Sequence, residues 1–198
     1  MEDTGLSQLI IDLSLPGITI NPIRILDGSH HFNEIVFQDV VVPRSMVWGE
    51  EGQGWSQVTA ELAFERSGPE RFLSTFPLLA AFAQRVSVTR DPTQVAALGR
   101  LAARLLALRQ MSLRVAEALE RGEVPHAEAA LVKDVGTTFE GDTIDEIRRV
   151  IDVVPSLNGV DALARLLAEA QLHAPAFTIR GGTNETLRGI VARELGLR

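Results

Sequence analysis

The sequence of 198 residues contains no cysteine, only four histidines and no long apolar run, and each scarcity excludes a class of protein. Without cysteine the chain forms no disulfide, performs no thiol catalysis and binds no zinc through thiolates. No two histidines have the H-x-x-x-H spacing that places a metal-binding pair on one helix face, so we expect no metal site. No apolar run approaches the roughly 18 residues that a bilayer-spanning helix requires.

Basic charge is also scarce. The chain has 19 Lys and Arg against 26 Asp and Glu, a formal net charge of −7, and its basic residues form no cluster. We therefore expect no nucleic-acid partner. The first five residues are acidic and polar, unlike a signal peptide, and we expect a cytoplasmic protein. A hydrophobic content of 45% is typical of a globular chain.

The pattern of apolar residues changes near residue 50. Before this point, short runs rich in β-branched residues predict strands over residues 8–13, 18–20, 23–26, 31–37 and 40–42. So few strands make a thin sheet. We expect the sheet to continue in something outside this chain.

From Gly54 onward, apolar residues recur at three- and four-residue steps, which predicts helices. A helix over residues 55–88 is expected to be interrupted at Gly68-Pro69 and Pro77. Further helices are predicted over residues 91–121, 125–151, 161–173 and 184–195. Long helices with short connections predict an antiparallel bundle.

Two short stretches contain residues that can carry chemistry. The first, residues 180–185, reads Arg-Gly-Gly-Thr-Asn-Glu just before the last predicted helix. Its glycines allow the backbone to approach a ligand, and the helix start favours an anion such as a phosphate. A tight turn with Thr183 as N-cap and Glu185 beside the helix dipole explains the same residues. The residues alone favour this simpler interpretation.

The second stretch surrounds Glu65, which follows Phe64 and precedes Arg66 in the predicted helix. An apolar environment favours a carboxylate that acts as a base. A Glu beside an Arg on a helix is more often solvated surface. The residues alone favour this structural role.

Taken in order, several segments of the chain resemble the acyl-CoA dehydrogenase family. The segments are residues 16–18 (Pro-Gly-Ile), 32–43, 49–55 (Gly-Glu-Glu-Gly-Gln-Gly-Trp), 62–66 (Leu-Ala-Phe-Glu-Arg), 181–185 and 192–197. Each segment by itself is weak evidence for the resemblance. The ordered set covers most of the chain and is specific.

The resemblance implies a fold of three parts, of which this chain holds the end of the middle β domain and the whole C-terminal bundle. The implied fold is mainly α, with a partial β domain over residues 1–48 and an antiparallel four-helix bundle over residues 49–198. The implied reaction is the flavin-dependent α,β-dehydrogenation of an acyl-CoA thioester, as in fatty acid metabolism. A carboxylate removes the α proton while a hydride passes to FAD.

The resemblance also implies roles for particular residues. In many members the base directly precedes the final Gly-Thr pair, where this chain has Gly181. In the isovaleryl and long-chain types the base precedes an Arg in the helix after the Gly-Trp loop, and Glu65-Arg66 matches that arrangement. Glu65 is then the base, with Phe64 and Arg66 at the substrate. The residues implied to lie near FAD are Gly181, Gly182, Thr183 and Glu185.

Two motifs depart from the family pattern. Residues 85–92 stand where the family has Arg-x-x-Phe-Gly, which reaches the flavin of a neighbouring subunit, and residues 156–159 replace Gly-Gly-x-Gly. These departures favour a second hypothesis, in which the chain is a non-catalytic or half-site subunit, or a truncated fragment, that supports a full-length partner. The implied partners are acyl-CoA, electron-transfer flavoprotein and further subunits, as a homo-oligomer or with a longer homologue.

Overall fold

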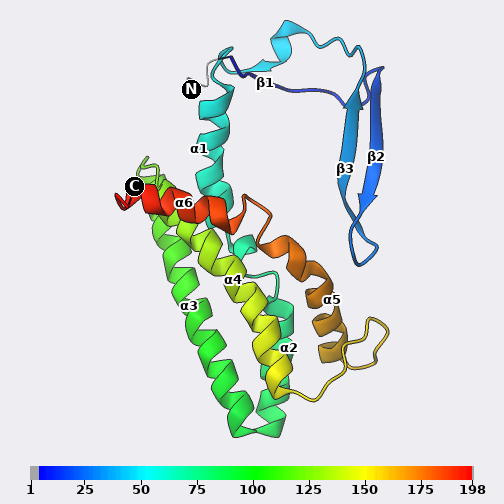
Figure 1. Cartoon of the computed structure of the whole chain (residues 1–198), viewed down its shortest axis with the longest axis vertical. Helices are drawn as coiled ribbons and strands as arrows, with labels where there is room; N and C mark the ends of the chain where they lie inside the picture. Colours follow the sequence, from blue (N-terminus) through cyan, green and yellow to red (C-terminus); the bar gives the residue numbers. More distant parts are fainter. Residues whose placement is uncertain (1–4, 198) are drawn as a thin grey trace. The chain divides into compact units, whose positions relative to one another are not determined.

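A computed structural model describes residues 5–197, apart from the side chain of Ala63 (Figure 1). The chain divides into two compact units, of which the first ends at Glu61 and the second begins at Leu62. This division lies within helix α1 (Gly54–Ser67). Each unit is described by itself below.

The first unit contains two small antiparallel sheets. Strand β2 (Ile18–Arg24) pairs with β3 (His30–Phe37), and β1 (Gln8–Leu9) pairs with β4 (Val47–Trp48). Nearly all side chains of β2 and β3 are exposed, including Phe32 at 55%. Neither face of this hairpin forms a core within the described residues, which agrees with the prediction of a partial β domain.

The strand predicted over residues 40–42 is not found. β3 ends at Phe37, after which the Gln38 N–H donates to the Gly17 carbonyl at 2.9 Å and Asp39 turns the backbone with a φ of +54°. The β-branched composition of residues 40–42 therefore did not decide their conformation, because the turn ends the ladder first. The other predicted strands are found with altered bounds.

The second unit is a helical bundle. Its helices α2 (Phe76–Thr89), α3 (Pro92–Glu120), α4 (His126–Val150) and α5 (Ala162–Phe177) run in alternating directions in Figure 1. Helix α6 (Asn184–Glu194) packs against α4. The interruption predicted within residues 55–88 is real, because the short 3-10 helix η2 (Pro69–Arg71) separates α1 from α2. The mainly α fold with its antiparallel four-helix bundle is confirmed.

The helix boundaries follow local chemical signals. Asp91 begins α3, since its carboxylate accepts hydrogen bonds from the N–H groups of Thr93 at 2.9 Å and Gln94 at 3.0 Å. Pro92 takes the first helical position, where its missing N–H costs nothing. Gly122, with a φ of +77°, turns the chain after this helix.

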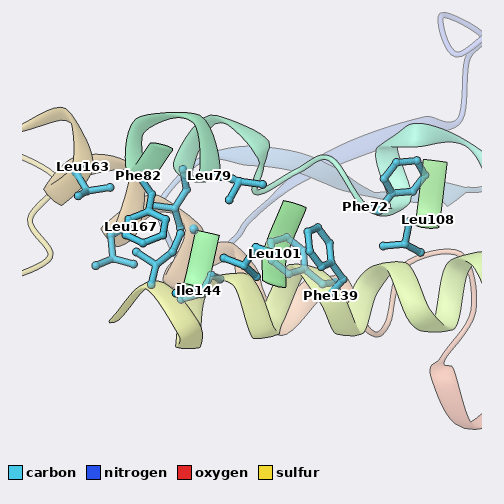
Figure 2. Packing of buried hydrophobic residues seen from close by; sticks show 14 of the residues in the cluster. Phe72, Leu79, Phe82, Leu101, Leu108, Phe139, Ile144, Leu163 and Leu167 are labelled. Atoms are coloured by element: carbon cyan, nitrogen blue, oxygen red, sulfur yellow. The ribbon is translucent and has the colours of Figure 1, made fainter. Parts of the chain in front are cut away.

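The hydrophobic core lies between the four bundle helices (Figure 2). Burial of one side chain of this kind contributes about 1.5–3 kcal/mol. The labelled members come from all four helices and from the segment after η2: Phe72, Leu79, Phe82, Leu101, Leu108, Phe139, Ile144, Leu163 and Leu167. Helix α4 is central, because it contacts α2, α3, α5 and α6. Polar residues on α4 are therefore held on a rigid support.

Candidate functional site

The turn of residues 178–184 joins α5 to α6 and contains the two predicted glycines. Gly181 and Gly182 have φ values of +68° and +94°, which glycine adopts without steric cost. The Asn184 N–H donates to the Thr178 carbonyl at 3.2 Å and closes the turn. The tight turn expected before the last helix is therefore present.

The first turn of α6 carries its own negative charge. Thr183 is the N-cap and accepts a hydrogen bond from the Thr186 N–H at 3.4 Å. A hydrogen bond from its own backbone N–H lowers the pKa of Glu185, and the Thr183 hydroxyl lowers it further. The carboxylate thus stays ionised and complements the positive end of the helix dipole.

The carboxylate of Glu65 lies near the end of α1 and pairs with Arg71 of η2. Arg71 donates through Nη2 to Glu65 Oε1, and through Nε to the Glu65 backbone carbonyl at 3.0 Å. The Arg71 side chain is 8% exposed, whereas that of Glu65 is 43% exposed. A buried guanidinium that binds both the backbone and the side chain of one residue restricts its orientation. The Glu65 carboxylate is therefore accessible to solvent, and the buried guanidinium of Arg71 fixes its orientation.

Arg66 connects this segment with the turn before α6. Its Nε donates to the Gly181 carbonyl at 3.4 Å. Arg71 also meets the turn, because a Cβ on Gly181 would lie 3.2 Å from Arg71 Cζ. Partial burial lowers the pKa of Arg66, and the charge of Glu65 opposes this effect. The structure thus brings Glu65, Arg66 and Gly181 together from two distant segments.

The other predicted site residues lie around this cluster. A Cβ on Gly182 would be 3.7 Å from Arg66 Nη2, so Gly182 borders the same guanidinium. Thr183 and Glu185 are exposed at the start of α6, and Phe64 is 62% exposed on α1. These part-buried contacts join Glu65, Arg66, Gly181 and Gly182, whereas Phe64, Thr183 and Glu185 are exposed and lie outside them.

Two buried ionisable residues of α4 lie beneath the turn, and the sequence analysis did not identify either. Lys133 is 0% exposed and donates to the Gly182 carbonyl at 2.6 Å. Glu140 is also 0% exposed and accepts from Arg180 Nη2 at 2.6 Å and from the Ser74 N–H at 2.8 Å. Burial raises the pKa of Glu140, while Arg180 and Ser74 oppose that rise.

Composition contains a signal that identifies Lys133. It is the only lysine in the sequence, so 18 of the 19 basic residues are arginine. Lysine offers a compact ammonium where arginine offers a planar guanidinium, so a single lysine among arginines distinguishes this position. Glu140 carries no comparable signal, because acidic residues are common along α4. Only the packing of the helix shows that it is buried.

Within residues 5–197, no group of three or more His, Asp or Glu side chains is placed to hold a metal ion. No helix in that range combines the length and the apolarity needed to cross a membrane.

Comparison with known proteins identifies the family of this bundle. Residues 78–196 match the C-terminal domain of acyl-CoA dehydrogenases, over α2 to α6. The chain therefore belongs to the acyl-CoA dehydrogenase family.

One curated relative and two solved structures illustrate this similarity. The acyl-CoA dehydrogenase IpdE1 of Mycobacterium tuberculosis is 32% identical over 204 residues, which cover 98% of this chain and 51% of the relative. The Tcur3481-Tcur3483 steroid ACAD (acyl-CoA dehydrogenase) superposes with a TM-score of 0.81 at 26% identity, covering 98% of this chain and 52% of that one. The chain spans about half the length of the curated relatives FadE29 and IpdE1 and 26% of FadE34.

One chain of the ChsE4-ChsE5 complex from Mycobacterium tuberculosis has the same fold. Its TM-score is 0.79 at 24% identity, and the match covers 98% of this chain and 53% of that one.

Proposed function

We propose that the chain is the C-terminal half of an acyl-CoA dehydrogenase subunit, whose assembly removes hydrogen from the α and β carbons of an acyl-CoA thioester. Membership of the family supports this reaction in general. One observation supports the assignment to this chain: Glu65-Arg66 and Gly181 lie together. These are the two positions at which family members carry the base, and this chain has a carboxylate at one and glycine at the other.

Glu65 is the proposed base that takes the α proton onto its carboxylate. A base that acts on a C–H bond must be both accessible and oriented before the substrate arrives. The 43% exposure of the Glu65 side chain supports the first requirement, and its ion pair with buried Arg71 supports the second. A Glu65 carboxylate that moved freely would have to be oriented in each turnover, which would slow proton removal.

Arg66 and Phe64 are the proposed substrate-binding residues. The Arg66 guanidinium lies beside the carbonyl of Gly181 and carries further N–H donors suited to an acyl-CoA oxygen. Phe64 exposes 62% of its surface, and an aromatic ring of this kind suits contact with an acyl chain.

FAD is the proposed cofactor, and when bound it supplies the acceptor for the β hydride. The guanidinium groups of Arg71 and Arg66 border the positions where a Cβ on Gly181 or Gly182 would stand, so the turn would offer such a group backbone atoms and arginine N–H donors. Glu185 already places a carboxylate at the start of α6, so this end favours a neutral, hydrogen-bonding part of the cofactor over its phosphates. The residues proposed to contact FAD are Gly181, Gly182, Thr183 and Glu185.

A half-site subunit is the second candidate, and the position of Arg85 favours it. Arg85 stands where the flavin-reaching motif of the family begins. Its Nη2 donates to Asp161 Oδ2 at 2.6 Å, and Asp161 is the N-cap of α5. This arginine is therefore engaged within its own subunit. In that case the chain would assemble with a longer homologue that completes the flavin site.

The assembly and the electron acceptor are also proposals. The ChsE4-ChsE5 structure is a complex, and one of its chains has this fold. A hetero-oligomer therefore suits the second candidate, and a homo-oligomer suits the first. Electron-transfer flavoprotein is the proposed electron acceptor, and the cytoplasm is the proposed location.

Replacement of Glu65 tests the proposal in the purified assembly that contains this chain. Glu65→Gln is expected to lower kcat by about 10²- to 10⁴-fold, the usual contribution of a general base. The visible flavin absorption is expected to persist, because the turn before α6 is unchanged. Glu61→Gln, at an exposed position one turn earlier on α1, is the matched control and keeps wild-type turnover. The assay is acyl-CoA-dependent reduction of an electron-accepting dye.

Unchanged turnover of Glu65→Gln with flavin bound would reject Glu65 as the base. The same result would favour the half-site subunit, in which the partner chain performs the chemistry.

A further inference from the structure

Lys133, the only lysine of the chain, is completely buried in α4. Removal of an ammonium group from water is costly unless hydrogen-bond acceptors replace the water. Lys133 Nζ donates to the Thr178 carbonyl at 3.2 Å, the Gly182 carbonyl at 2.6 Å and Asn184 Oδ1 at 2.8 Å. Three acceptors match the three N–H donors of an ammonium group.

These acceptors lie at separate points of the turn of residues 178–184. Thr178 is the C-cap of α5, where helix carbonyls carry partial negative charge, and Asn184 is the first residue of α6. Gly182 lies between them. Thr137, one turn further along α4, donates to the same Asn184 Oδ1 at 3.2 Å. The Lys133 ammonium group thus connects α4 by hydrogen bonds to the end of α5, to the turn and to the start of α6.

The same turn contacts the Glu65-Arg66 segment. The Gly181 carbonyl accepts from Arg66 and the Gly182 carbonyl accepts from Lys133, so neighbouring carbonyls bind cations from α1 and α4. A displaced turn would move the acceptor of Arg66, the residue beside the proposed base. Small displacements of this kind lower reaction rates strongly.

We propose that Lys133 is a positioning residue, whose buried ammonium holds the turn of residues 178–184 in the conformation that the dehydrogenation site requires. Its catalytic consequence rests on the proposed function, whereas its effect on the turn does not. Because Lys133 is fully buried, it acts through Gly182 and Asn184 and not on the substrate.

The surrounding charges make this anchor sensitive to pH. Burial lowers the pKa of Lys133 to about 8, with a further contribution from Arg71 and smaller ones from Arg180 and Arg66, while Asp134 opposes the change. Below that pH the ammonium has three donors for three acceptors. Above it a neutral amine has only two donors and no charge, so one acceptor loses its partner. By linkage, an opening of the turn that returns Lys133 to water takes up a proton above about pH 8, so a rising pH does not by itself open the turn.

Backbone amide hydrogen exchange, followed by mass spectrometry on the purified assembly, tests the effect on the turn. Lys133→Met removes the charge and the donors but keeps an unbranched chain. Arg149→Met makes the same charge change at a position of α4 that is 70% exposed. The amides of residues 178–187 are expected to exchange at least tenfold faster in Lys133→Met. The peptides of α3, and the whole Arg149→Met protein, are expected to keep wild-type rates.

A second measurement needs no variant. Lysine labelled with ¹⁵N in this chain gives a single side-chain signal, because the chain has one lysine. The midpoint of its titration is expected near pH 8. The exchange of the turn, corrected for the intrinsic pH dependence, is expected to slow as the pH rises above that midpoint, because opening the turn returns Lys133 to water and takes up a proton. A midpoint near the ordinary value of about 10.4 would overturn the proposal. Wild-type exchange of the turn in Lys133→Met would overturn it as well.

Kinetics separates this proposal from the proposed function. With an acyl-CoA substrate, kcat of Lys133→Met is expected to fall at least tenfold. Faster exchange of the turn with unchanged kcat would reject the positioning role. A wild-type assembly that retains flavin but oxidises no acyl-CoA would refute the proposed function, while the exchange data would still decide whether Lys133 anchors the turn.

Discussion

Two glycines in the interior of α4 allow a direct test of how closely this helix approaches the Glu65 segment. A Cβ on Gly136 would lie 2.7 Å from the Arg71 carbonyl oxygen and 3.2 Å from Phe72 Cβ. No atom lies within 4 Å of a Cβ on Gly141. Alanine at either position gains similar helix propensity, about 1 kcal/mol. The comparison of the two variants therefore isolates the cost of the contact.

Opposite consequences are expected from the two replacements. Gly141→Ala is expected to stabilise the protein by about 0.5–1 kcal/mol, since the methyl group enters open space. In Gly136→Ala the methyl group meets backbone, which yields less easily than a side-chain tip. Overpacking of this kind costs about 1–3 kcal/mol, so the Gly136→Ala protein should be less stable than the Gly141→Ala protein by about that amount. Each kcal/mol corresponds to about 2–4 °C in Tm for a chain of this size.

Thermal unfolding of the purified assembly, followed by far-UV circular dichroism at one subunit concentration, measures this difference. Equal Tm values for the two variants would refute the close approach of α4 to η2. Gly136→Ala is also expected to lower turnover, because the displaced segment carries Arg71 and thus the partner of Glu65. Gly141→Ala is expected to leave turnover unchanged.

Two further predictions concern stability. The pKa of Lys133 is about 8 in the native protein and 10.5 in an ordinary lysine, so the unfolded chain binds more protons between these values. The free energy of unfolding should therefore rise with pH across this window, and this rise should vanish in Lys133→Met. Urea denaturation at a series of pH values measures this slope, and a flat wild-type curve would contradict it. Asp161→Ala removes the N-cap hydrogen bond to the Leu163 N–H at 3.0 Å and should cost about 1 kcal/mol. The ion pair of Asp161 with Arg85 adds little to stability, because both side chains are exposed. An unchanged free energy of unfolding of Asp161→Ala in the same assay would therefore contradict the role of the cap.

The sequence by itself was sufficient to predict the helices of this protein and the family to which it belongs. Helix starts and ends depend on neighbouring residues, as Asp91 with Pro92 and Gly122 show, so local patterns predict them well. The strand predicted over residues 40–42 failed for a related reason. Strand formation depends on pairing with another segment, and the turn at Asp39 ended that pairing.

Only the tertiary structure decided which residues meet. Arg66 and Gly181 are separated by 115 residues, and no pattern within either segment places them in contact. Lys133 stands out as the only lysine of the chain, yet only the packing of α4 against α6 shows that it is buried beside the turn. Burial then changes its chemistry, because an ammonium removed from water must find its hydrogen-bond partners in the protein and loses its proton more easily. Such effects arise from contacts between segments that are distant in the sequence, and only the folded structure brings those segments together.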